Sequence, residues 1–139
     1  MQVSLDWKQG LSFHGSAPSG HSVDLSAYKD VGGTGDGFAP EELVALGLGG
    51  CTGMDIISIL QKKQQDVQKL QLRVTTQKRD EHPKVWTHAL IEYIVTGSNI
   101  DPAAVDRAIQ LSSEKYCPAQ NMFKKAVQIE TRYEIKQAG

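Results

Sequence analysis

The stretch "LGLGGCTGMDIISIL", residues 46–60, is the most apolar part of this 139-residue chain and decides its fold. From Leu43 to Leu60, apolar residues lie almost all round the expected helix, and a helix that is apolar on every side is buried on every side. A chain this short can build only one core to cover it. We therefore expect an α+β fold in a single domain, residues 1–139, with a central buried helix and a second copy of the chain completing its cover in a homodimer.

The expected helix begins at Pro40, with Glu41 and Glu42 in its first turn, where acidic side chains interact favourably with the helix dipole. It continues to about Gln65. Glycines in this segment each lower helix propensity by about 1 kcal/mol relative to alanine. They predict either a break in the helix or the close approach of another backbone. The glycines are residues 47, 49, 50 and 53.

The flanking segments predict the rest of the fold. Period-2 alternation in residues 2–7 and 22–28 indicates strands, and alternation in 70–79 and 84–95 indicates a long antiparallel hairpin. Asp101 and Pro102 are typical of a helix start, and the inward positions of that helix include Val105 and Ser112. Cys117-Pro118 interrupts it because a residue before proline avoids helical geometry. A short helix can restart at Pro118, and residues 126–135 close the chain as a strand. This order of elements is typical of an α+β protein.

Composition excludes several classes of function. Lysine plus arginine number 15 and aspartate plus glutamate 16, for a net charge of -1, which argues against nucleic acid or a membrane surface as partner. The apolar run around Cys51 is expected to fall short of the roughly 20 residues of a membrane span. The first 30 residues do not have the pattern of a signal peptide. Two cysteines make a secreted disulfide scaffold improbable, so we expect a reducing, cytoplasmic location.

Cys51 and Asp55 are one helical turn apart and share a face. Cys51 is either a small core residue or a reactive thiol. Asp55 is not a direct activator of that thiol, because a neighbouring negative charge raises a cysteine pKa. A carboxylate in an apolar helix needs a partner. It therefore pairs with a structural group or organises a cation.

Cys117 would stand at the N-terminus of a helix beginning at Pro118, where free N–H groups favour a thiolate. The alternative is an inert thiol at a helix junction. If the two cysteines meet in space, they form either a structural disulfide or a redox pair.

Together, "APEELVALGLGGCTGMD" and "KYCPAQN" resemble the OsmC/Ohr family of thiol-dependent hydroperoxide reductases. Pro40, Glu41 and Leu43, then Cys51, then Cys117-Pro118 match the family pattern, and the resemblance covers essentially the whole chain. It implies an OsmC/Ohr-like fold, with β-sheets around a central buried helix, in an intertwined homodimer. The segments "GGCTGMD" and "EHPKVWT" resemble those of the OsmC-like, YhfA-type branch of the family.

The resemblance implies that Cys51 is the peroxidatic thiol, Cys117 the resolving thiol and Glu41 a supporting carboxylate. An external dithiol, lipoyl-type in some members, would restore the pair, and no bound cofactor is implied. Apolar walls would favour organic hydroperoxides as substrates. The residues expected to form these walls are Leu46, Met54, Met122 and Phe123.

One feature of the family is absent, because its N-terminal arginine has no counterpart before Arg73. Lys29 or Arg79 is the candidate activating cation, with His14 or His21 as further alternatives. Ten residues of straight helix span about 15 Å, so Glu41 reaches Cys51 only through a break at the glycines or from the partner subunit.

Two hypotheses about function follow. One is a cytosolic thiol peroxidase, and the other is a non-catalytic redox sensor or apolar small-ligand-binding protein on the same fold. His82 and His88 lack the short spacing of zinc ligands, so no metal site is expected.

Overall fold

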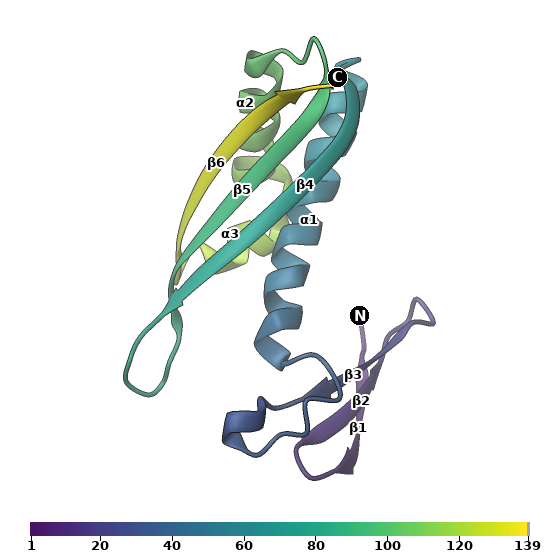
Figure 1. The fold of residues 1–139 in the computed structure, drawn as a ribbon, viewed down its shortest axis with the longest axis vertical. Coiled ribbons are helices and arrows are strands. Elements are labelled where there is room, and N and C mark those ends of the chain that lie inside the picture. Colours follow the sequence, from purple (N-terminus) through teal and green to yellow (C-terminus); the bar gives the residue numbers. More distant parts are fainter. Residues whose placement is uncertain (139) are drawn as a thin grey trace. The chain divides into compact units, whose positions relative to one another are not determined.

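The structure is a computed structural model that describes residues 1–138 (Figure 1). The chain divides into two compact units, Met1–Ala45 and the part from Leu46 onward, while the prediction of a single domain stays a prediction. In chain order the elements are β1 (Ser4–Gln9), β2 (Ser12–Ser16), β3 (Ser22–Ser26), the short 3-10 helix η1 (Lys29–Val31), α1 (Pro40–Lys62), β4 (Asp66–Lys78), β5 (Trp86–Ser98), α2 (Pro102–Leu111), the π-helical turn η2 (Ser112–Tyr116), α3 (Pro118–Phe123) and β6 (Gln128–Gln137).

The first unit contains a three-stranded antiparallel sheet in the order β1-β2-β3. Trp7 pairs with Phe13, and Phe13 pairs with Leu25, so these three side chains share one face of the sheet. The pairs two residues along the strands, Leu5 with Gly15 and Gly15 with Val23, lie on the same face. The sheet therefore has one apolar face, as the alternation predicts, yet Leu5, Trp7 and Phe13 are exposed.

The polar face of this sheet holds the glycine-rich loop before α1. Asp36 accepts hydrogen bonds from the hydroxyls of Ser12 at 3.0 Å and Thr34 at 2.7 Å. These bonds lower the pKa of Asp36 to about 2, the Thr34 bond being the larger cause. The loop is thus tied to β2 by a hydrogen-bonded carboxylate.

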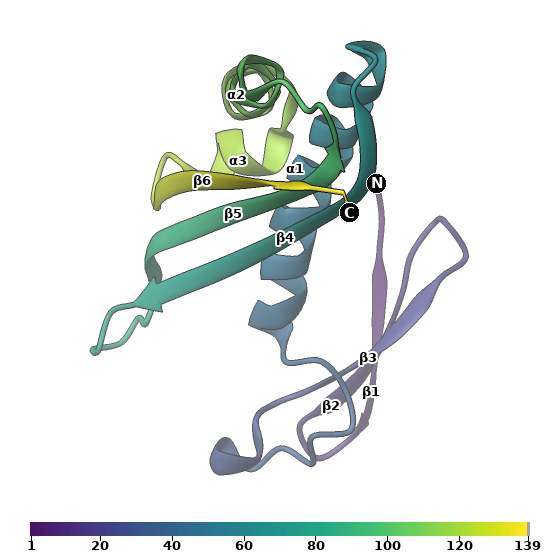
Figure 2. The same ribbon diagram turned by 45° about the horizontal axis from the view of Figure 1, so that its top comes forward.

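The second unit has a sheet in the order β4-β5-β6, in which β4 and β5 form the predicted antiparallel hairpin. The last strand, β6, pairs with β5 in parallel. Helices α2 and α3 and the second part of α1 lie on the same face of this sheet (Figure 2). Alternate β5 residues point at the helices and have no exposed surface; they are Ala89, Ile91, Tyr93 and Val95. The expected α+β class, with two sheets and a long central helix, is confirmed.

Helix α1 runs without interruption through its glycines, so the predicted break is wrong, and it ends at Lys62 rather than near Gln65. A Cβ on Gly49 would lie 3.1 Å from Val74 on β4, so the close neighbour there is a side chain and not a second backbone. Gly47 and Gly50 face open space. Packing against β4 therefore outweighs the low helix propensity of these residues.

The predicted start of α2 is confirmed. Asp101 is its N-cap and accepts a hydrogen bond from the Ala103 backbone N–H at 3.0 Å, and Pro102 is the first helical residue. Val105 and Ser112 are buried as expected. The helix passes into the π-helical turn η2 and stops at Cys117, where the predicted interruption and restart at Pro118 both occur.

One expectation about α1 is wrong. The helix has 23 residues and, by length and composition, is long and apolar enough to cross a membrane. The prediction that this apolar segment is shorter than a membrane span is therefore wrong. The core helix of a soluble protein has the same length and composition, but α1 is only partly buried in one protomer, so the expectation that it is buried on every side is not met within the chain. Leu48, Ile56 and Leu60 of α1 belong to the hydrophobic core of the second unit.

Candidate functional site: a pair of thiols

The two cysteines of the chain lie side by side in the second unit. Cys51 is on α1 and half-buried, and Cys117 stands between η2 and α3 with no exposed surface. Both are free thiols, and the Cys117 thiol lies close enough to Cys51 to raise the pKa of Cys51. Two sulfurs 66 positions apart in sequence are thus within reach of each other, and the partly exposed one is Cys51.

Local backbone geometry places Cys117. Its N–H donates to the Ser112 carbonyl at 2.8 Å, five residues back, which closes the π-helical turn. Pro118 then prevents the helix from continuing, and Cys117 adopts extended backbone angles as the N-cap of α3. Its sulfur accepts a hydrogen bond from the Gln120 backbone N–H at 3.4 Å. π-helical turns of this kind often occur at functional sites.

A buried polar network surrounds the Cys117 sulfur. The hydroxyl oxygen of Thr52, which follows Cys51 on α1, lies 3.5 Å from it. The Gln120 side-chain amide donates to the same Thr52 oxygen at 3.0 Å. Thr52 and Gln120 are at most 2% exposed, so both polar groups find their partners within this cluster.

Asp55 has a structural partner, which was one of the two alternatives expected from the sequence. Its carboxylate accepts a hydrogen bond from the hydroxyl of fully buried Ser112 at 2.9 Å. This bond joins α1 to η2 beside the thiols. Asp55 also raises the pKa of Cys51, as expected for a neighbouring negative charge.

Within one protomer, the surroundings of Cys51 favour its neutral thiol. Burial is the largest cause and raises the pKa of Cys51. The Ala119 backbone, near the start of α3, lowers this pKa, while the Cys117 thiol and Asp55 raise it further. Among residues 46–138, no lysine, arginine or histidine contributes to this shift.

Tyr93 on β5 brings a buried hydroxyl to the same region. It has no exposed surface, and its burial raises the pKa of the phenol well above its usual value. The Gln120 side chain lies near enough to oppose this rise in part, but the hydroxyl makes no well-formed hydrogen bond within the described chain. Tyr93 is therefore a neutral hydroxyl at this site.

Of the other polar residues predicted for the site, Glu41 and Lys29 belong to the first unit and Arg79 belongs to the second. Glu41 is in the first turn of α1, ten residues before Cys51 on an unbroken helix, and therefore about 15 Å away along its axis. Lys29 lies in η1 of the first unit, and Arg79 is exposed in the loop after β4.

The expected apolar walls are largely open in one protomer. Leu46, Met54 and Met122 are each more than half exposed. Phe123 instead packs on Trp86, with ring centroids 5.9 Å apart, at the margin of the core.

Sequence reasoning missed Thr52, Gln120 and Tyr93 as members of the site. Gln120 lies within the "CPAQ" segment, and Thr52 follows the first cysteine directly, so adjacency to a thiol is the one signal that could have found them. Tyr93 is distant in sequence from both cysteines and carries no such signal. Among residues 1–138, no group of three or more histidine, cysteine or acidic side chains could hold a metal ion.

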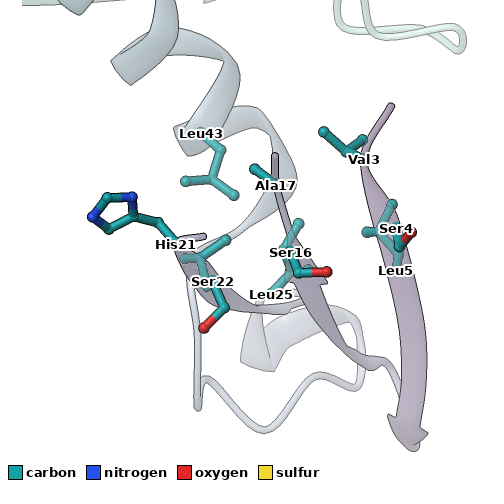
Figure 3. A pocket seen from close by; sticks show the side chains of 11 residues that line it. Val3, Ser4, Leu5, Ser16, Ala17, His21, Ser22, Leu25 and Leu43 are labelled. Atoms are coloured by element: carbon teal, nitrogen blue, oxygen red, sulfur yellow. The ribbon is translucent and has the colours of Figure 1, made fainter. Parts of the chain in front are cut away.

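Two surface cavities have linings that include neither Cys51 nor Cys117. One of about 430 Å³ lies next to the site and includes Asp55, Ile59 and Tyr116 in its wall. A cavity of about 300 Å³ lies on the first unit's sheet, where Leu43 of α1 stands beside Ala17 (Figure 3). This second cavity has a mainly apolar lining and contains no thiol.

Comparison with known proteins identifies the family. Residues 33–132 match the family described as OsmC-like protein. The chain is 41% identical to Protein YhfA of Escherichia coli K12 over 136 residues, 97% of this chain and 98% of that protein.

Two solved structures extend the likeness. A hypothetical protein from Aquifex aeolicus VF5 is 26% identical, with a TM-score of 0.88 over 99% of this chain and 97% of that one. An organic hydroperoxide resistance protein OsmC from Legionella pneumophila, also described as a predicted redox protein, is 16% identical, with a TM-score of 0.70 over 96% and 97% of the two chains. The second likeness shows the fold alone. The resemblance read from the sequence is thus confirmed, and the chain belongs to the OsmC-like family.

Proposed function

We propose that this protein is a thiol-dependent peroxidase that reduces organic hydroperoxides, with Cys51 as the peroxidatic and Cys117 as the resolving cysteine. The observation that carries the proposal is the contact between a half-buried thiol and a fully buried one at the start of α3. The accessible thiol, Cys51, is the one that a peroxide can reach. The family membership and the name of the Legionella relative agree with this chemistry.

The reaction needs three steps. The Cys51 sulfur attacks the terminal peroxide oxygen, the O–O bond breaks, an alcohol leaves and Cys51 becomes a sulfenic acid. The Cys117 sulfur then attacks the sulfur of Cys51, which forms the disulfide and releases water. An external dithiol, for which dihydrolipoamide is the probe, reduces the disulfide by exchange and is itself oxidised. No bound cofactor is required.

A homodimer is part of the proposal. Leu5, Trp7 and Phe13 lie exposed on one face of the first sheet, and Leu46 and Met54 are exposed on α1. Such a set of apolar groups is typical of a surface that a partner covers. A second copy of the chain would bury them and could form the apolar substrate walls with Met122 and Phe123.

The dimer would also supply the electrostatics that one protomer lacks. Because α1 is unbroken, Glu41 can support a peroxidatic thiol only in the partner subunit. A cation beside Cys51 would counter the burial that raises the pKa of this thiol. Lys29 and Arg79 remain the candidates for that cation.

Steady-state reduction of cumene hydroperoxide with dihydrolipoamide tests the proposal. We expect turnover in the wild type and its loss in Cys51→Ser. Cys117→Ser should lose most turnover but still consume about one equivalent of peroxide per chain. Equal turnover in the wild type and Cys51→Ser would contradict the proposal.

The second candidate function is a redox sensor, and the raised pKa of Cys51 favours it. A thiol that is mostly neutral near pH 7 reacts slowly with peroxide, because the thiolate is the nucleophile. A sensor would form the Cys51–Cys117 disulfide with an oxidant yet show no sustained turnover with dihydrolipoamide. The same assay therefore separates the two functions.

A further inference from the structure

Thr52 and Gln120 have no part in the three steps above, yet both are buried around the resolving sulfur. Gln120 holds the Cys117 sulfur through its backbone N–H at 3.4 Å and holds the Thr52 hydroxyl through its side-chain amide at 3.0 Å. Thr52 in turn lies 3.5 Å from the same sulfur. The three residues form a closed set of contacts between α1 and α3.

The Cys117 thiol has two hydrogen-bonding neighbours in this set. The Gln120 backbone N–H donates to its sulfur, and the Thr52 hydroxyl either donates to the sulfur or accepts from the thiol S–H, while its oxygen also accepts from the Gln120 side-chain amide. Either direction of the Thr52 contact favours the thiol form, because a disulfide has no S–H and is the weaker acceptor. Bulk water does not replace these contacts, because Thr52 and Gln120 are buried.

We propose that Thr52 and Gln120 are positioning residues that hold Cys117 in its reduced form and thereby make the Cys51–Cys117 pair more oxidising. The inference rests on the proposed function in that it treats the two thiols as a redox pair. It adds a role for a threonine and a glutamine that act on the pair through the resolving sulfur.

The physical reason is the difference between the two redox states. Reduction of the disulfide adds two electrons and two protons, drawn from an external dithiol, and restores a Cys117 thiol that the Thr52 hydroxyl and the Gln120 backbone N–H both contact. In the disulfide this sulfur must lie about 2.05 Å from that of Cys51, and it is a weaker acceptor. Contacts that stabilise only the dithiol raise the reduction potential of the pair, as in other strongly oxidising dithiols.

The test is a redox equilibrium that does not depend on peroxidase activity. Full-length wild-type protein and variants are equilibrated at pH 7 in mixtures of reduced and oxidised dithiothreitol, and the disulfide fraction is measured by alkylation and mass spectrometry. Thr52→Val removes the hydroxyl while keeping the side-chain shape. We expect its equilibrium to shift toward the disulfide by about fivefold, which is the size of one hydrogen bond of about 1 kcal/mol.

Further variants separate positioning from packing. Thr52→Ser keeps the hydroxyl and should return the equilibrium to within about twofold of the wild type. Gln120→Met should shift it in the same direction as Thr52→Val but by less, because the Thr52 hydroxyl can still reach the sulfur. Thr75→Val, at an exposed position on β4, is the matched control and should leave the equilibrium unchanged. Thermal unfolding of each variant shows that it is folded, and Gln120→Met carries the test if Thr52→Val is not.

The outcomes distinguish this inference from the proposed function. If the wild type forms a Cys51–Cys117 disulfide but Thr52→Val and Gln120→Met have the wild-type equilibrium, the positioning role is overturned and the redox pair stands. A shift toward the dithiol in either variant would also overturn it. If the wild type forms no disulfide in any buffer, both the proposed function and this inference fail.

Discussion

The apolar side chains of β5 at 89, 91, 93 and 95 have no exposed surface, whereas Leu5, Trp7 and Phe13 of the first sheet are 53%, 66% and 40% exposed. Both sheets are built from the same alternation of apolar and polar residues. The difference lies in what covers them. Helices of the same unit cover β5, whereas the first sheet has an apolar face without such a layer. Alternation thus predicts which residues share a face, but not which part of the assembly buries that face.

The largest effect should come from placing a charge on the exposed apolar face. Leu5→Asp should weaken the proposed homodimer by about a hundredfold or more, since an unpaired charge buried at an interface costs roughly 3–5 kcal/mol. Gln9→Asp, on the polar face of the same strand where Gln9 pairs with Ser12, is the control and should have little effect. Sedimentation equilibrium measures both. A Leu5→Asp dimer as tight as the wild type would show that this face is not the interface.

Within the second unit, truncation in the covered core should lower folding stability. Ile56 of α1 has no exposed surface, so Ile56→Ala should reduce the free energy of unfolding by about 2–5 kcal/mol. Ser58→Ala, at an exposed position on the same helix, should change it by no more than about 0.5 kcal/mol. Urea unfolding of both variants provides the comparison, and a similar loss in the two would mean that α1 is not packed as described.

The first unit should carry an acid-sensitive contribution to stability. The pKa of Asp36 is lowered from 3.8 to about 2, so its contribution is fully present above pH 3.8 and is lost as the pH falls through about 2. Asp36→Asn removes this contribution. The difference in melting temperature between wild type and variant should therefore be constant above about pH 4 and shrink toward zero near pH 2. A difference that does not depend on pH would contradict the assigned hydrogen bonds to Ser12 and Thr34.

A smaller effect should appear at the thiols. Asp55 is the last of the causes that raise the pKa of Cys51, so Asp55→Asn should lower that pKa by removing the negative charge while keeping an acceptor for Ser112. The rate of Cys51 alkylation by iodoacetamide against pH, measured in a Cys117→Ser background, reports the change. Its midpoint should move to lower pH. A midpoint that rises would mean that loss of the Ser112 contact outweighs the charge.

Much of the fold could be predicted because its signals are local. Asp101 and Pro102 fix the start of α2 through capping and a preset backbone angle, and Pro118 fixes the break after Cys117. The continuity of α1 could not be predicted, because the contact of Gly49 with Val74 is tertiary and outweighs propensity. The parallel pairing of β6 with β5 is likewise a property of the assembled sheet.

The candidate site divides in the same way. Cys51 and Cys117 stand in motifs that the sequence displays, and the structure brings them together. Packing of α1, α3 and β5 brings three further residues to the site, Thr52, Gln120 and Tyr93. Their spacing in the sequence does not predict these positions. The sequence predicted a partner for Asp55 because a carboxylate lies in an apolar helix, but only the structure identifies that partner as Ser112.

The most direct test of the redox pair is intact-mass and peptide mass spectrometry after one equivalent of cumene hydroperoxide. The wild type should lose two hydrogens and yield a peptide in which Cys51 is joined to Cys117. Cys117→Ser should instead gain one oxygen, trapped as a sulfenic acid on Cys51. A wild-type protein that keeps both thiols free, or a Cys117→Ser variant with no adduct at Cys51, would contradict the account.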